Sequence, residues 1–172
     1  MIKTTYNMKR LLILLLFIPL MSIGQSYKDV MSIKSVDSFK KVAIENAYEF
    51  DNVDEDDWVT YGYNIVRDSI GGNKSSKWMY YSKTDDKFTL LFSRKGKGLF
   101  GNVIDIDNSD NEYDLIVADI KEKCKYYTII NYKGIDYVSY SCSESSYKGK
   151  IAFVIDEGWG VIRHFPPNAP TE

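Results

Sequence analysis

The stretch from residue 35 to residue 65 reads SVDSFKKVAIENAYEFDNVDEDDWVTYGYNI and changes its hydrophobic period halfway along. Apolar residues after Ser35 recur at helical spacing, which predicts an amphipathic helix. These apolar residues are Phe39, Val42, Ala43, Ala47 and Phe50. From Trp58 to Ile65 apolar side chains occupy every second position instead, which predicts a strand with one buried face.

The second half of the chain returns to the same plan. Ser109 and Glu112 have the spacing of a capping box, so a second helix is expected to start near residue 110. Its apolar positions are Tyr113, Ile116, Val117, Ile120, Cys124 and Tyr127. Runs with a period of two, separated by turn residues, predict further strands at 77–82, 88–93, 127–132, 136–142, 150–155 and 159–165.

The two halves match each other in residue class. WVTY at 58–61 matches YVSY at 137–140 at an offset of 79, and the two helical patterns match at an offset of 77. We interpret this match as a degenerate tandem repeat of a helix and three or four strands, although such elements also resemble one another through pattern alone. The predicted fold class is α+β, with two amphipathic helices on one continuous or two adjoining antiparallel β-meander sheets.

This layout resembles the tandem helix-plus-sheet repeats of the β-lactamase inhibitory protein and of some small envelope lipoproteins. No family motif accompanies the resemblance, so it implies an architecture and no activity. The predicted domain is 25–172, with sub-repeats at 27–104 and 105–165 and a flexible tail at 166–172.

The first 24 residues have the three-part pattern of a secretory signal peptide, with basic residues, an apolar run and small residues in that order. Three basic residues precede an apolar run of 11 residues from Leu11 to Met21, whereas a membrane-spanning helix needs about 20 residues. The small residues Ser22 and Gly24 favour cleavage between Gly24 and Gln25, and Met8 is an alternative start. We therefore expect export to a periplasm or to the extracellular space, without a permanent membrane span.

Composition excludes several classes of function. The chain of 172 residues has a formal charge of −2, and removal of residues 1–24 leaves 148 residues with a charge of −5, which disfavours nucleic-acid binding. One histidine and two cysteines are too few for the common zinc sites. They also provide only one histidine to act as the base of a catalytic triad. The sequence predicts no metal and no cofactor.

The two cysteines are expected to form a disulfide. Cys124 and Cys142 are an even pair in a chain with an export signal, and closing their 18-residue separation stabilises a fold by about 3 kcal/mol. The alternative is a reactive thiolate at Cys142 served by the only histidine, His164.

Two charged segments are weaker candidates for ligand binding. Acidic residues cluster at 51–57 and 105–112, which suits a hard cation such as calcium, but neither cluster matches the calcium-loop template. Arg94, Lys95 and Lys97 alternate with glycines, so this loop is a candidate anion cradle or a site that orients an acidic partner. The alternatives are solvated acidic connections and a flexible basic hairpin loop.

Aromatic residues provide the remaining candidate site. Trp58 lies on the side of its predicted strand opposite the apolar set, and the run from Met79 to Tyr81 places rings on both sides of the next strand. A face that carries Trp58, Trp78 and Tyr80 is predicted to bind a partner, because flat rings contribute contact area at little cost in rotamer entropy. A second core layer of aromatic side chains is the alternative.

These observations favour a non-enzymatic binding module of the adaptor or inhibitor type. Its partner is expected to be a protein or glycan of the cell envelope. A self-associating structural envelope protein is the alternative, and a hydrolase is the weaker one, because no spacing in the chain specifies a catalytic constellation.

Overall fold

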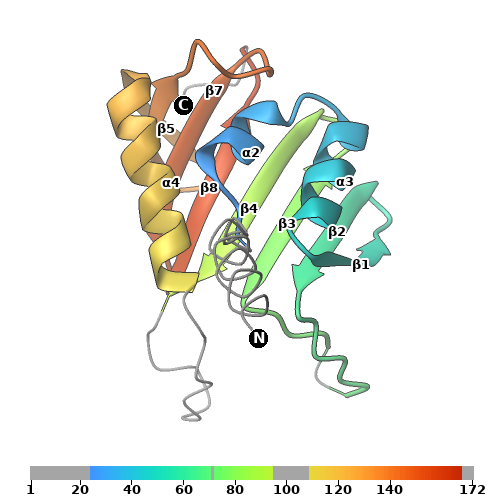
Figure 1. The fold of residues 1–172 in the computed structure, drawn as a ribbon. Helices are drawn as coiled ribbons and strands as arrows, with labels where there is room; N and C mark the ends of the chain where they lie inside the picture. The colour runs from blue at the N-terminus through green and yellow to red at the C-terminus, as the bar shows by residue number, and fades with distance from the viewer. Residues whose placement is uncertain (1–23, 71, 95–108, 168–172) are drawn as a thin grey trace, which may run out of the picture.

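The computed structural model describes residues 24–70, 72–94 and 109–167. Within these ranges the chain forms one eight-stranded antiparallel sheet with three helices on one face (Figure 1). This arrangement is α+β with more strand than helix. None of these three helices has the length and hydropathy that a membrane crossing needs.

Most elements lie close to their predicted positions. The helices are α2 (Tyr27–Ser32), α3 (Val36–Glu45) and α4 (Ser109–Lys123). The strands are β1 (Tyr48–Val53), β2 (Trp58–Tyr63), β3 (Lys77–Ser82), β4 (Lys87–Ser93), β5 (Lys125–Tyr132), β6 (Ile135–Ser141), β7 (Lys150–Asp156) and β8 (Trp159–Phe165). Each of the seven predicted strands is present within two residues of its expected bounds.

The strand order is symmetric about the middle of the sheet. The order is β1-β2-β3-β4-β8-β7-β6-β5. The first half is two helices followed by four strands, the second half is one helix followed by four strands, and the last strands of the halves pair with each other. Thr89 on β4 is the register partner of Arg163 on β8. The sheet is therefore continuous, and the duplication of an ancestral unit stays a prediction.

The first predicted helix is shorter than its apolar pattern suggested. α3 ends at Glu45, where the Asn46 side chain donates to the Val42 carbonyl oxygen and Ala47 has a positive φ of 59°. Phe50 consequently lies on β1 and not on a helix. The prediction was wrong there because Tyr48 and Phe50 fit a period of two as well as a helical one.

α2 was missing from the sequence prediction. Its six residues are too few for a periodic signal, and its start depends on a capping box in which Ser26 and Asp29 bond reciprocally. Tyr27, Val30 and Met31 of α2 are buried, so this short helix is held mainly by packing.

The main core lies between the helices and the sheet. Phe39 of α3 contacts the rings of Tyr61 and Tyr81, and Tyr113 of α4 lies near Phe92. Gly160 on β8 lies directly beneath the Tyr113 ring, where an added Cβ would meet the ring carbons at 2.6 Å. Close approach of α4 to β8 therefore depends on the absence of a side chain at this position.

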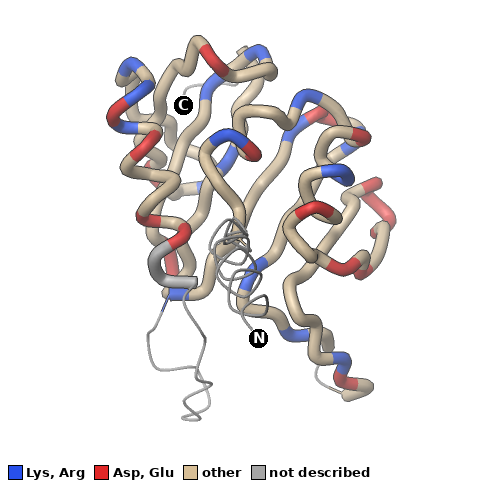
Figure 2. Tube along the Cα trace, viewed as in Figure 1, with Lys and Arg blue, Asp and Glu red and all other residues tan. Residues whose placement is uncertain are grey.

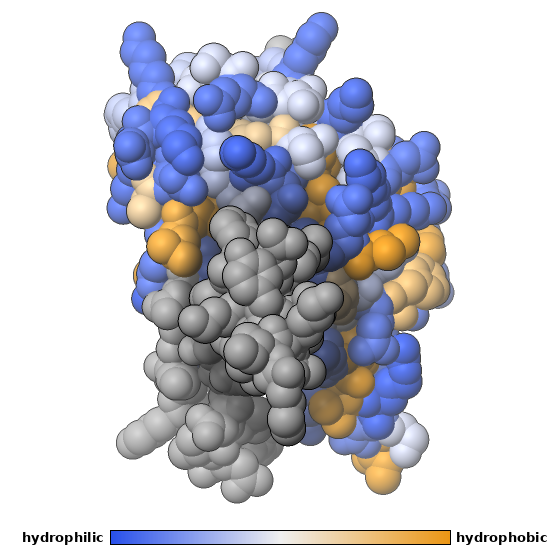
Figure 3. Space-filling model, in the orientation of Figure 1, coloured by the Kyte–Doolittle hydropathy of each residue, from blue (hydrophilic) through white to orange (hydrophobic). Residues whose placement is uncertain are grey.

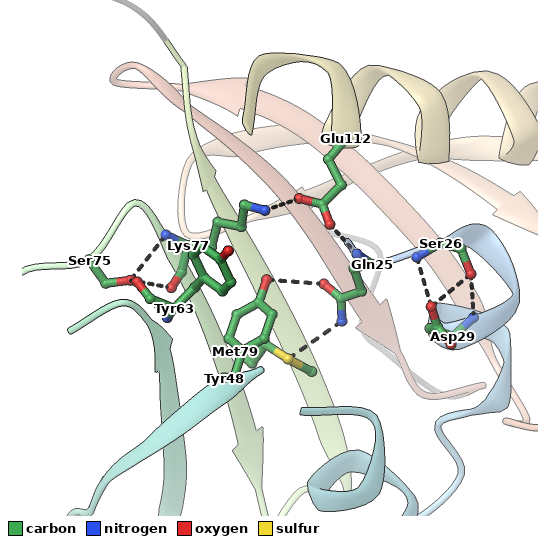
Figure 4. A network of polar contacts seen from close by, with 9 residues as sticks. All are labelled: Gln25, Ser26, Asp29, Tyr48, Tyr63, Ser75, Lys77, Met79 and Glu112. Atoms are coloured by element: carbon green, nitrogen blue, oxygen red, sulfur yellow. Dashed lines mark hydrogen bonds and ion pairs between the residues drawn. The ribbon is translucent and has the colours of Figure 1, made fainter. Parts of the chain in front are cut away.

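Glu112 does not serve mainly as the capping residue that its spacing suggested. Its carboxylate lies inside the fold, where it pairs with Lys77 of β3 and accepts from the backbone nitrogen of Gln25 (Figure 4). The side chains of Lys77 and Glu112 are only 9% and 10% exposed. A buried charge must be paired, so this pair fixes α4 to the centre of the first four strands.

Candidate functional site

The face of the sheet that no described helix covers is the candidate site. The helix-side surface is mostly hydrophilic outside the grey atoms, with small separate apolar spots (Figure 3). Acidic and basic residues are interspersed along α4 (Figure 2). Val59 and Tyr61 face the helices, so their neighbours Trp58 and Thr60 lie on the uncovered face.

The structure places the predicted binding residues Trp58, Trp78 and Tyr80 on this uncovered face. The rings of Trp78 and Tyr80 lie side by side with centroids 6.3 Å apart. Trp78 is buried because its ring covers Gly62, where a Cβ would lie 2.8 Å from the ring. Trp58 and Tyr80 are half-buried, so they retain accessible surface. Burial, assisted by the nearby Asp51 carboxylate, raises the pKa of Tyr80 to about 12, which keeps its hydroxyl available as a donor.

Sequence reasoning missed the cations that lie among these rings. The Nζ of Lys87 on β4 lies 5.6 Å from the Trp58 ring and 5.8 Å from the Tyr132 ring. The guanidinium of Arg163 on β8 lies 4.6 Å from the same Tyr132 ring and donates to Thr89 at 3.1 Å. We call Trp58, Lys87, Tyr132 and Arg163 the aromatic–cation belt.

The belt exists because the sheet curls. Lys87 and Tyr132 lie on β4 and β5, which are four strand positions apart in the sheet order, or about 19 Å apart in a flat sheet. Their contact therefore requires the half that contains β5 to bend over the uncovered face. Tyr132 and Tyr137 both contact the Phe165 ring, at 5.7 and 5.5 Å between centroids.

The curled half contains a second hydrophobic core. Its buried members are Ile130, Tyr137, Ala152, Val161 and Phe165. The alternative to a binding face, a second core layer of aromatic side chains, therefore fits the part of the uncovered face around Phe165. Trp58 and Tyr80 lie outside this cluster. Period-two alternation identifies Arg163 as facing this side, but Lys87 lies one residue before the predicted strand at 88–93, and the alternation contains no signal for the curl.

Arg94, from the candidate anion loop, lies against α4. Its guanidinium pairs with Asp114 at 2.7 Å and lies 5.4 Å from the Tyr113 ring. Lys95 and Lys97 lie outside the described residues, as do the side chains of most of the second acidic cluster. In the first cluster, Asp54 accepts from the backbone nitrogens of Asp56 and Trp58 in the turn before β2. Within residues 24–70, 72–94 and 109–167, no three His, Cys, Asp or Glu side chains are grouped as metal ligands.

The disulfide prediction is confirmed. Cys124 and Cys142 are bonded, with Cα atoms 4.5 Å apart, and this bond ties the end of α4 to the end of β6. Cys142 consequently has no free thiol, which removes the alternative of a thiolate served by His164.

His164 is a buried neutral imidazole. It is fully buried, stacks on Phe88 at 5.6 Å and touches the Tyr147 ring, whose centroid is 3.6 Å away. Neither ring nitrogen has a hydrogen-bond partner among the described residues. Burial lowers the pKa of His164 to about 4. This effect is larger than those of the Lys148 backbone and the Asp86 charge, which raise the pKa.

This burial predicts an acid-dependent loss of stability. The unfolded chain gains a proton at His164 below pH 6.5, while the folded chain stays neutral down to about pH 4, so stability falls as pH falls through that window. The free energy of unfolding, measured on untagged protein at pH 7 and at pH 4, should fall between these two pH values. The fall should be up to about 3 kcal/mol larger in the wild type than in His164→Leu. Parallel losses in the two proteins would contradict the prediction.

Comparison with known proteins adds no assignment to this geometry. The chain matches no protein family, no curated protein and no solved structure.

Proposed function

We propose that this protein is an exported, non-enzymatic binding module that engages a protein or glycan of the cell envelope through the aromatic–cation belt. The proposal depends on one observation above all, the line of alternating rings and cations on the uncovered face. Export is supported by the signal-like pattern of residues 1–24 and by the Cys124–Cys142 bond, since disulfides persist in oxidising compartments.

The chemistry of the belt suits recognition. Trp, Tyr and Arg are the residues that most often dominate binding energy, and the two aromatic ones bury large areas with few rotatable bonds. The Arg163 guanidinium is held between the Tyr132 ring and Thr89, so little conformational entropy remains to be lost on binding. Arg163 gives this face a cationic group in a chain that is acidic overall, which favours a partner with acidic or hydroxyl groups, whereas the Lys87 ammonium already pairs with Asp85 at 2.5 Å.

Capture from an envelope extract tests the proposal. The exported full chain serves as bait beside a Trp58→Ala/Tyr80→Ala variant, which removes one ring of the belt and the Tyr80 ring next to Thr89, the partner of Arg163. A Leu115→Ala variant is the control on α4, where Leu115 is 66% exposed. We expect one partner whose binding weakens at least about tenfold in the double variant and is unchanged in the control. Trp78 is left intact because its ring packs on Gly62. Equal capture by all three baits would contradict the proposal.

One observation favours self-association as a second candidate function. β5 is an eight-residue edge strand, and three of its large apolar side chains, Tyr126, Tyr127 and Ile129, are more than half exposed. Exposed edges of this kind can pair with a second chain. Sedimentation velocity on the same bait distinguishes the two functions, since the binding-module proposal expects the mass of a single chain.

A further inference from the structure

Gln25 is anchored inside the fold at both its backbone and its side chain. Its backbone nitrogen donates to Glu112 Oε1, and its side-chain nitrogen donates to the Met79 sulfur at 3.5 Å (Figure 4). Its side-chain oxygen accepts from the Tyr48 hydroxyl at 3.4 Å. The residue is 4% exposed, so the fold encloses both its backbone nitrogen and its side chain.

The Glu112 carboxylate, which accepts the hydrogen bond from the Gln25 backbone nitrogen, belongs to the buried ion pair with Lys77 described above. Glu112 Oε2 pairs with the Lys77 ammonium, which also lies 4.6 Å from the Tyr63 ring. Glu112 Oε1 faces Gln25. One buried carboxylate thus divides its two oxygens between a lysine and the backbone nitrogen of residue 25.

The position of this contact coincides with the predicted cleavage point. The signal-peptide pattern predicts cleavage between Gly24 and Gln25. Gln25 is the first buried residue of the described chain, and Ser26 begins the capping box of α2. The segment that starts the packed structure is therefore the segment that the cut would expose as a new terminus.

We infer that Glu112 is the internal receptor for the N-terminal ammonium that export processing frees at Gln25; this inference rests on the export part of the proposed function. A signal peptidase hydrolyses the Gly24–Gln25 bond with one water, whose hydroxyl goes to the Gly24 carbonyl carbon and whose proton goes to the Gln25 nitrogen. The neutral amide donor becomes an amine and, with a further proton from solvent, an ammonium. Charge-assisted hydrogen bonds to a carboxylate are about twice as strong as neutral ones.

The same site protects the new terminus from cyclisation. An N-terminal glutamine loses ammonia when its amine attacks its own side-chain amide carbon and forms a pyroglutamyl ring. In the fold the amide of Gln25 is directed at Tyr48 and Met79, while the nitrogen is directed at Glu112 (Figure 4). These contacts hold the two reacting groups on different partners, so the folded protein should retain an intact N-terminal glutamine.

Mass spectrometry and amine labelling test the inference. The full chain is exported, purified and analysed by intact mass and N-terminal sequencing, then treated near neutral pH with an amine-acylating reagent, folded and in denaturant. We expect an uncyclised terminus at Gln25 whose labelling is about tenfold or more slower in the folded protein, because local opening must precede reaction. Glu112→Gln should speed the folded-state labelling, whereas Asp119→Asn, at a more exposed carboxylate of α4 paired with Lys123, should not.

Three results would overturn the inference. These are a different or unprocessed terminus, a pyroglutamyl terminus, and a Gln25 amine that labels equally fast in the folded and unfolded protein. The wild-type comparison decides the matter even if Glu112→Gln fails to fold. Capture through the belt is measured separately, so a failed terminus prediction and a failed binding prediction are distinguishable.

Discussion

Replacing Gly149 by alanine is expected to destabilise the protein by roughly 3–5 kcal/mol, because backbone strain and steric overlap add at this position. Gly149 has a φ of 146°, a conformation that residues with a Cβ rarely adopt. A Cβ there would also lie within 3.0 Å of the Phe165 carbonyl oxygen and the His164 ring. Denaturant unfolding of the two proteins measures the difference.

Gly134→Ala is the matched control for this substitution. Gly134 has a φ of 78°, but no atom lies within 4 Å of the position of its added Cβ. It should therefore cost only the backbone strain, about 1–2 kcal/mol. Similar losses in the two variants would show that crowding against His164 contributes nothing.

In the unprocessed chain, Lys77→Met is expected to destabilise the protein by about 3–5 kcal/mol, since it leaves the Glu112 carboxylate buried without its cation. Methionine retains most of the volume of lysine, so lost packing contributes little. In the unprocessed chain, where residue 25 has a neutral amide nitrogen, the double variant Lys77→Met/Glu112→Gln should recover part of the loss, because an amide oxygen still accepts from Gln25 and no charge is left buried. Free energies of unfolding for the four proteins of this cycle give the coupling.

Lys123→Met provides the comparison at the surface. Lys123 pairs with Asp119 at 2.6 Å, but the two side chains are 40% and 37% exposed, and pairs of that kind contribute about 0–1 kcal/mol. If Lys77→Met costs no more than Lys123→Met, the buried pair does not fix α4 as we describe.

The sequence predicted elements better than it predicted contacts. Alternation located β2 to β8 because one face of each strand is buried along its length, and helical spacing located α3 and α4. The end of α3 was missed because Asn46 and Ala47 form a local turn that leaves no periodic signal. The first residues of β1, up to Phe50, fit both periods and were therefore assigned to the helix.

The candidate site could be predicted only in part. Trp58, Trp78 and Tyr80 were placed on one face by local alternation, which requires no knowledge of strand order. The belt joins Lys87 to Tyr132, and that contact depends on pairing across the whole sheet and on its curl. Likewise, the spacing of Glu112 suggested a cap, whereas its partners Lys77 and Gln25 are distant in sequence.

The symmetric strand order also determines when the protein can fold. The central pair of the sheet joins β4 to β8. Thr89 on β4 therefore gains its second neighbouring strand only when Arg163, 74 residues later in the chain, has been synthesised. Such long loop closure is slow, because the entropy of the intervening chain must be lost before the contact forms. The first half therefore stays incomplete until the last strand has been synthesised, and on the proposed export route this delay would keep the chain unfolded while it crosses the membrane.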